Sequence, residues 1–262
     1  MWECHTVRAL LFTSEEPLYL PRYLEPVFAA HADAIEAVVV ANPPAPVHEQ
    51  VRAQYRMFGQ RAFVQLGAKY ARGRLLDAFG DLAVRLTGRY HSVARLARDH
   101  GVTVREAGDL SSPDFGRWVE RLAPDLLLSV VCGQRVPDAV LETATDAVNL
   151  HGSLLPKYRG RAVAFWPLYH GDDETGVTAH VMTDEWDAGP LIERRRVPIA
   201  DDTYHSLSLK LADAGGDLAV DLLDRYPCEF DTRPNDTTDD DYHSLPSPAQ
   251  RRAFLRAGHR FV

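Results

Sequence analysis

The most informative residues of this chain are Asn149-Leu-His151-Gly-Ser153-Leu-Leu-Pro156-Lys-Tyr-Arg159-Gly160. They close an apolar run that begins at Ala147, and a short apolar run of this kind predicts a buried β-strand. Residues two apart on a strand point to the same face, so Asn149 and His151 are expected to lie side by side where the strand ends. Open α/β sheets carry their chemistry at the carboxyl ends of strands, which makes this strand end the candidate site.

A carboxylate follows later in the chain, at Asp187 in Trp186-Asp187-Ala188-Gly189. Taken alone, each of the three polar residues has a structural explanation: a strand-end histidine, a capping asparagine and an Asx-turn aspartate. Together they supply a donor for an oxyanion, a proton carrier that works near neutral pH and a carboxylate that orients it. The combination predicts acyl transfer.

The same residues resemble the N10-formyltetrahydrofolate-dependent formyltransferases. The shared pattern is Asn-x-His-x-Ser-Leu-Leu-Pro-x-x-x-Gly followed by Asp-x-Gly. The likeness covers about residues 92–212 and includes Pro124-Asp125, Gly133-Gln134, Thr175-Gly176 and Asp202-Thr203 in the family's order. It implies N10-formyltetrahydrofolate as the formyl donor and no metal.

Residues 149–162 are most similar to the formyltransferase domain of the bifunctional enzyme that modifies UDP-4-amino-4-deoxy-L-arabinose. Methionyl-tRNA formyltransferases share His-Gly-Ser-Leu-Leu-Pro, whereas the purine-pathway glycinamide ribonucleotide enzymes usually have Pro at the position of Gly152. The resemblance is therefore closest to the sugar N-formyltransferases, which are often homodimers.

The resemblance also implies roles for individual residues. Asn149 holds the oxyanion, while His151 and Asp187 manage protons in a division that the sequence leaves open. Ser153, Arg159 and Gly160 support the loop, with Arg159 either contacting an anion or serving the structure alone. The flat slot for the folate is expected from two loops, at Cys132, Gly133, Gln134, Arg135, Val136, Leu141, Met182, Asp184 and Trp186. For Cys132, a small buried hydrophobe is the preferred interpretation.

Hydrophobic periodicity predicts a Rossmann-like α/β fold. Residues 7–13, 35–41 and 126–131 are expected strands, and residues 19–30 an expected helix. No Gly-x-Gly-x-x-Gly follows the first strand; Ser14-Glu-Glu-Pro stands there, so a nicotinamide dinucleotide site is not predicted.

A helical hairpin is expected to be inserted at about residues 48–90. Apolar residues recur there at helical spacing, with a turn expected at residues 71–74. The arabinose-type domain is shorter at this point. Residues 51–100 carry ten Lys or Arg and three acids, in a chain of net charge −8. The hairpin is interpreted as a solvated face. The alternatives are that it binds an anionic acceptor, the acidic tail, another copy of the chain or, through its apolar face, a membrane surface.

The catalytic domain is expected to span residues 1–228 and a short C-terminal extension residues 229–262. A helix over residues 203–223 is predicted, with Asp202 as its N-cap. The segment 231–241 is rich in Asp and Thr and is expected to be loosely ordered, whereas 242–262 is expected to fold back on the body. Too little chain follows the helix for the C-terminal barrel of methionyl-tRNA formyltransferases.

Composition restricts the remaining classes of function. The acidic balance argues against nucleic-acid binding over the whole surface. No apolar run is long enough to span a bilayer, no secretory signal is visible, and the three cysteines show no zinc or disulfide spacing, so a cytoplasmic protein is expected.

The sequence therefore predicts an enzyme that transfers a formyl group to a primary amine, with an amino sugar linked to a nucleotide as the expected small-molecule acceptor. The alternatives are another small amine, methionyl-tRNA, hydrolysis of formyltetrahydrofolate, and a non-catalytic folate- or nucleotide-binding protein.

Overall fold

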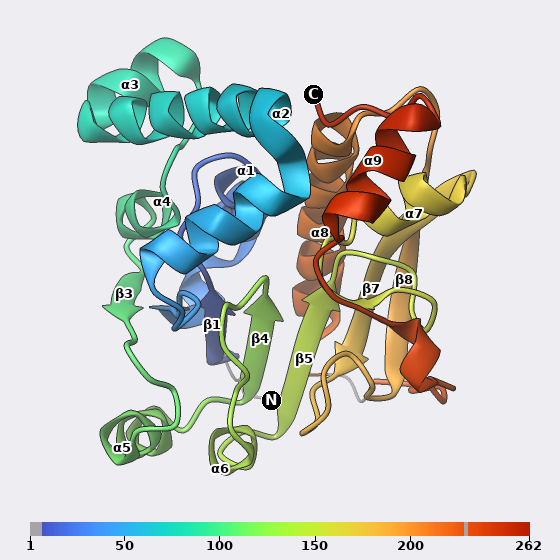
Figure 1. The fold of residues 1–262 in the computed structure, drawn as a ribbon. Helices are drawn as coiled ribbons and strands as arrows, with labels where there is room; N and C mark the ends of the chain where they lie inside the picture. The colour runs from blue at the N-terminus through green and yellow to red at the C-terminus, as the bar shows by residue number, and fades with distance from the viewer. Residues whose placement is uncertain (1–6, 228–229) are drawn as a thin grey trace.

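The computed structural model of the protein describes residues 7–227 and 230–262. Its centre is a seven-stranded sheet in the order β3-β2-β1-β4-β5-β7-β8 (Figure 1). Strands β1 to β5 run parallel, and β7 and β8 complete one side as an antiparallel pair. The bounds are β1 Ala9–Thr13, β2 Ile35–Val40, β3 Thr103–Glu106, β4 Leu126–Val130, β5 Asp146–His151, β7 Glu174–Val181 and β8 Leu191–Pro198. The predicted Rossmann-like α/β fold is confirmed.

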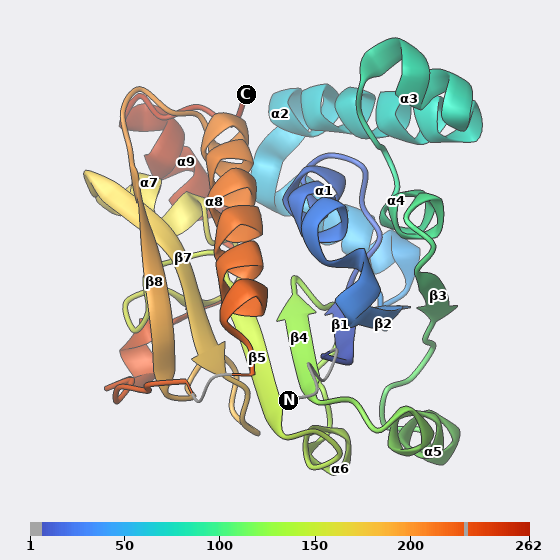
Figure 2. The same ribbon diagram turned by 180° about the vertical axis from the view of Figure 1, so that it is seen from behind.

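Helices cover both faces of the sheet. α1 (Leu20–His31) and α8 (Tyr204–Arg225) lie together on one face, as Figure 2 shows from behind, and they share one core with Leu11, Leu128 and Val148. α5 (Pro113–Leu122) and α6 (Asp138–Leu141) pack on the other face. The remaining helices are η1 Ala32–Ala34, α2 Val47–Ala78, α3 Asp81–Thr87, α4 Val93–Asp99, α7 Phe165–His170, η2 Asp239–Asp241 and α9 Pro248–Arg256.

Strand β5 directs its polar residues away from the α1–α8 core. Val148 and Leu150 are buried in that core. Because side chains alternate along a strand, Asn149 and His151 point to the opposite face. This is the shared orientation that the spacing of the two residues predicts.

Two local expectations need correction. The inserted hairpin does not turn at residues 71–74: α2 continues through them, and the reversal comes at Phe79 and Gly80 before α3. The break in α2 lies at Gly59, whose φ of 71° is left-handed. The N-cap of α8 is Thr203, which forms a capping box with Ser206, so the predicted cap was one residue early.

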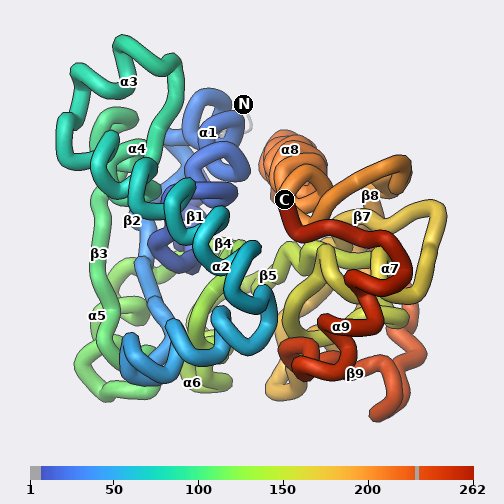
Figure 3. The backbone as a smooth tube through the Cα atoms, turned by 45° about the horizontal axis from the view of Figure 1, so that its top comes forward, coloured from blue at the N-terminus to red at the C-terminus, as the bar shows by residue number. Residues whose placement is uncertain are grey.

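We call α2 and α3 the arm. Figures 1 and 2 show it beyond the carboxyl ends of β4 and β5, and Figure 3 shows α2 passing beside α9. Large apolar side chains are exposed along it, among them Val64, Leu75 and Leu86, at 62%, 60% and 78%. Over the described ranges, no helix has the length and apolar character needed to cross a membrane.

The C-terminal extension is fixed to the body at several points. Arg233 exchanges two backbone hydrogen bonds with Leu191, both of 2.8 Å. β9 (Tyr242–His243) pairs in parallel with β6 (Arg159–Gly160) as a separate two-stranded sheet. The loose order expected for residues 231–241 is therefore wrong, and the predicted return of residues 242–262 to the body is found. The expected domain boundary at residues 228 and 229 lies outside the described residues.

An aromatic cluster secures the end of the extension. Phe254 of α9 is fully buried, with ring centroids 4.8 Å from both Phe165 and Phe261. We expect Phe254→Leu to lower the free energy of unfolding by about 1–2 kcal/mol, because stacked aromatic pairs contribute beyond their buried area. Urea denaturation measures this loss. The control is Leu255→Ala, at a neighbouring side chain that is 48% exposed; equal losses in both variants would contradict the assignment.

Candidate active site

Two segments bring the predicted trio together. Asn149 and His151 come from β5, and Asp187 comes from the loop between β7 and β8. Asp187 Oδ1 lies 3.3 Å from His151 Nδ1 and 3.4 Å from Asn149 Nδ2. His151 and Asp187 are both buried, at 6% and 7% exposure. The predicted convergence of amide, imidazole and carboxylate is present.

Both ring nitrogens of His151 face acceptors. Nδ1 faces the Asp187 carboxylate, and Nε2 lies 2.7 Å from the backbone oxygen of Tyr158. A carbonyl oxygen only accepts, so Nε2 carries a proton, and the carboxylate favours a second proton on Nδ1. Burial alone would lower the pKa of His151, but Asp187 and the Tyr158 carbonyl outweigh it and the pKa is raised. Both contacts therefore favour the imidazolium form of His151.

Asp187 is held in its charged form. Burial by itself would raise the pKa of its carboxyl group, yet the adjacent His151 holds that pKa well below the usual range. The other oxygen, Oδ2, accepts from the Gly160 N–H at 2.9 Å. The backbone of Asp187 has φ +53°, a left-handed conformation that is uncommon outside glycine and in which Asp is enriched.

This ion pair makes the stability of the protein depend on pH. The raised pKa of His151 gives stabilisation that is complete below its usual value of 6.5 and lost as pH rises through the folded value. The lowered pKa of Asp187 gives stabilisation that is complete above 3.8 and lost as pH falls through the folded value. The pair is thus most stabilising between these two usual values.

A double-mutant cycle measures the coupling. With His151→Gln, Asp187→Asn and the double variant, we expect a larger coupling energy in urea unfolding at about pH 6 than at about pH 9. A coupling that is equal at both values, or larger at the alkaline one, would contradict the charged pair.

His180 belongs to the same network, and sequence reasoning gave it no role. It lies opposite Asn149 in the β5–β7 register. Its Nδ1 is 2.8 Å from the Val181 oxygen, which places the proton on that nitrogen, and its Nε2 accepts from Asn149 Nδ2 at 3.0 Å. Asn149 is thereby oriented by two acceptors. The long contact of 3.4 Å to Asp187 is one that an incoming oxyanion can replace. A sequence signal for His180 is the alternation of side chains along β7. Val177 and Ala179 face the α1–α8 core, so His180 faces the same side of the sheet as Asn149.

The loop after β5 is held by Tyr158 and Arg159. The Tyr158 carbonyl accepts from His151 and, at 2.7 Å, from Ser153 Oγ. Arg159 is only 3% exposed and donates from Nε and Nη2 to the Trp186 carbonyl, at 3.0 and 2.7 Å. It therefore fastens the segment that carries Asp187. Gly160 has φ +90°, and a Cβ there would meet the His243 oxygen at 2.5 Å, which explains the glycine.

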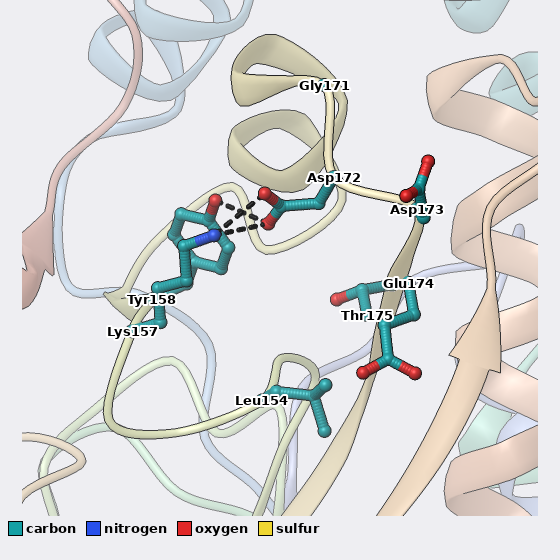
Figure 4. A pocket seen from close by; sticks show the side chains of 8 residues that line it. All are labelled: Leu154, Lys157, Tyr158, Gly171, Asp172, Asp173, Glu174 and Thr175. Carbon is teal, nitrogen blue, oxygen red and sulfur yellow. Dashed lines mark hydrogen bonds and ion pairs between the residues drawn. The ribbon is translucent and has the colours of Figure 1, made fainter.

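The side chain of Tyr158 reaches a neighbouring cavity of about 500 Å³ (Figure 4). Its hydroxyl donates to Asp172 at 2.6 Å, and Lys157 Nζ lies 2.7 Å from the same carboxylate. Burial first, and then Asp172, raise the pKa of Tyr158. The acidic residues that line this cavity are separate from Asn149, His151 and Asp187. Asp172 contributes to the site by holding Tyr158, whose carbonyl binds His151.

The two loops expected to form the folate slot meet. Arg135 Nη1 donates to the Asp184 oxygen at 3.1 Å, which bridges the loop after β4 to the loop after β7. Gln134 ties the first loop to the Asn42 and Gly108 carbonyls, and Gly133 lies against Pro43, where a Cβ would come within 2.5 Å. Val136 is buried, Trp186 is 46% exposed, and Cys132, Leu141 and Met182 pack against the core of the α5–α6 face.

Val131 was not among the residues predicted from the sequence. It follows β4, one residue beyond the end of that strand, with φ +52°, and is 56% exposed. A β-branched residue in the left-handed region is strained, and such strain concentrates at functional sites. No sequence pattern marks it, because the strain arises from the turn between β4 and the slot.

The loop after β1 carries two glutamates that bind backbone N–H groups. Glu15 accepts from the N–H groups of Val93 and Ala94 at the start of α4, and Glu16 accepts from Leu18 and Tyr19 ahead of α1. The N–H groups ahead of the first helix are those that a dinucleotide site would offer to a pyrophosphate, and Glu16 accepts from two of them.

The formyl transferase family model matches residues 8–223. Two methionyl-tRNA formyltransferases are similar in sequence. That of Thermosynechococcus vestitus is 36% identical over 156 residues, 58% of this chain and 47% of the relative, and that of Myxococcus xanthus is 40% identical over 136 residues, 51% and 44%. The chain spans about half the length of these curated relatives.

Solved structures share the fold at low sequence identity. Glycinamide ribonucleotide transformylase 1 of Symbiobacterium toebii has 16% identity and a TM-score of 0.58, covering 89% of this chain and 96% of that one. The N-formyltransferase of Helicobacter canadensis, in complex with folinic acid and dTDP-3-aminofucose, has 16% identity and a TM-score of 0.57, covering 91% and 70%.

Proposed function

This chain belongs to the formyl transferase family, and we propose that it moves a formyl group from N10-formyltetrahydrofolate to the primary amine of an amino sugar carried by a nucleotide. The observation that carries the proposed chemistry is the buried His151–Asp187 pair beside Asn149. An amide donor next to an imidazolium suits a reaction in which negative charge develops on a carbonyl oxygen.

The proposed reaction has two steps. The amine nitrogen attacks the formyl carbon, and the carbonyl electrons move to oxygen, where the Asn149 amide stabilises the oxyanion. The C=O bond then re-forms as the bond from carbon to N10 breaks. The His151 imidazolium gives its proton to N10, and neutral His151 takes back a proton from the former amine nitrogen. The products are the formamide and tetrahydrofolate, and His151 ends as it began.

The donor is proposed to bind between the loops that Arg135 bridges. A pterin is flat and needs apolar walls with backbone partners at its edge. Val136, Leu141 and Met182 supply apolar surface on these loops. The folinic acid bound by the Helicobacter canadensis enzyme supports a folate ligand for this fold.

The acceptor is proposed from the likeness of residues 149–162 to the arabinose-type domain and from the charge of the arm. The arm carries seven Lys or Arg and three acids, and it lies beyond the strand ends at which His151 stands (Figure 1). Guanidinium groups bind pyrophosphate well. The Helicobacter canadensis structure is a complex with dTDP-3-aminofucose, a molecule of this class.

Methionyl-tRNA is the second candidate acceptor. Both curated relatives carry that name at 36% and 40% identity. The basic arm suits a nucleic-acid backbone as well as a pyrophosphate, so the acceptor has to be decided by assay.

Release of tetrahydrofolate from N10-formyltetrahydrofolate tests the proposal. The acceptors to compare are UDP- and dTDP-amino sugars, free amines, methionyl-tRNA and buffer alone. We expect turnover with one amino-sugar nucleotide and its loss in His151→Gln. Turnover with methionyl-tRNA and no other acceptor would make methionyl-tRNA the acceptor. Turnover in buffer alone would indicate a hydrolase. No turnover with any of these acceptors would overturn the amino-sugar assignment.

A further inference from the structure

The loop that carries Asp187 is fastened from two sides. Arg159 of β6 binds the carbonyl of Trp186, as described above. On the other side, Nδ2 of Asn235 donates to the Asp187 carbonyl at 3.1 Å and to the Gly189 carbonyl at 3.0 Å. Asn235 lies in the C-terminal extension, outside the residues that match the family model.

The loop conformation explains why it needs such a fastening. Asp187 is left-handed, and a single left-handed residue other than glycine is held only where its surroundings fix it. This turn sends the carboxylate toward β5 while the carbonyls of residues 187 and 189 face the extension. A Cβ on Gly189 would meet the Val181 oxygen at 1.9 Å, so the loop is already pressed against β7.

The extension also holds the second donor to Asp187. The Gly160 N–H that binds Oδ2 belongs to β6, which pairs with β9 of the extension, and the Arg161 N–H donates to the His243 carbonyl at 2.7 Å. The extension therefore contacts both the backbone that carries the carboxylate and the backbone that binds it.

We propose that Asn235 is a positioning residue for the reaction, which keeps the Asp187 carboxylate against His151 by binding the backbone on either side of Ala188. This inference rests on the proposed function. An amide is required, because two carbonyl oxygens need two N–H donors at one point. A carboxylate of the same shape has no donor and repels both oxygens.

The test compares Asn235→Asp and Asn235→Ser with the wild type and with Asp236→Asn as control. Asp236 is the neighbouring exposed residue, and its substitution keeps the extension intact. The first readout needs no substrate: the pKa of His151 is measured by NMR titration of its ring proton, assigned by its loss in His151→Gln. The charged groups around this ring are Asp187 and Arg159, with His180 close by.

We expect the His151 titration in Asn235→Ser to shift downward by about half a pH unit or more, since a nearby carboxylate that moves away stops favouring the cation. Asn235→Asp should shift it less, because its new negative charge offsets part of the loss, and Asp236→Asn should leave it unchanged. The second readout is kcat, which we expect to fall about 10–100-fold in Asn235→Asp with little change in KM, because small displacements of a catalytic group are costly.

An unchanged His151 titration in both Asn235 variants, with only a lower melting temperature, would overturn the proposal and leave Asn235 a structural residue. If Asn235→Asp does not fold, Asn235→Ser decides by the same titration. If the wild type turns over none of the acceptors, the proposed function fails, yet the titration still reports whether Asn235 positions Asp187.

Discussion

His151→Gln is expected to lower kcat by about 10³-fold, within the range that positioned proton transfer contributes. Glutamine keeps a polar group near the Tyr158 carbonyl, so the loop stays bound. It removes the positive charge beside Asp187 and the proton that N10 needs to leave. KM is expected to change little, because the ring acts on the transition state more than on the bound substrates.

The pH profile gives a second readout for this residue. The wild-type rate is expected to fall as pH rises through the raised pKa of His151, because the imidazolium is lost. That alkaline limb should be missing in His151→Gln. His31→Gln, at the last residue of α1 and outside the proposed site, is the control and should keep both the rate and the limb. A variant at His151 that retains wild-type kcat would remove the proposed mechanism.

Asn149→Ala is expected to lower kcat by about 10²–10³-fold, the usual cost of losing one oxyanion donor. His180 and Asp187 already orient the amide, so the side chain of Asn149 does not have to rotate when the oxyanion forms. Steady-state kinetics distinguish transition-state stabilisation from substrate binding: if Asn149 acts on the transition state, kcat and kcat/KM should fall together. A change confined to KM would mean that Asn149 binds the ground state instead.

Asn149→Asp sharpens this prediction. The new carboxylate would lie near Asp187 Oδ1, where like charges repel, and it would also oppose the oxyanion. We expect its kcat to be lower than that of Asn149→Ala. The reverse order would show that the side chain does not face the developing charge.

The sequence was sufficient for the parts of the structure that follow local rules. The two-residue spacing of Asn149 and His151 fixed their common face through strand alternation. Their meeting with Asp187 came from the resemblance, since no periodicity predicts where a loop 36 residues on will return. β8 was not predicted from the sequence, because residues 193–196 are all charged. Such charges are common in a strand at the edge of a sheet, where β8 lies.

Other errors came from reading composition as structure. Gly73 was interpreted as part of a turn, but it is a helical residue packed on Pro17, where a Cβ would come within 2.8 Å. The polar segment 231–241 has the composition of a loose tail. Its order comes from Arg233 and Asn235, which bind residues more than forty positions earlier. Such distant pairings leave no trace in composition.

The pairing of β6 with β9 bears on when this enzyme acquires its activity during synthesis. His151 leaves the ribosome about 90 residues before His243, a delay of roughly 5–20 s at ordinary translation rates. During that interval the sheet can form, but the backbone around Asp187 and Gly160 still lacks its partners. We therefore expect catalytic competence to arrive late in synthesis, once β9 has paired with β6.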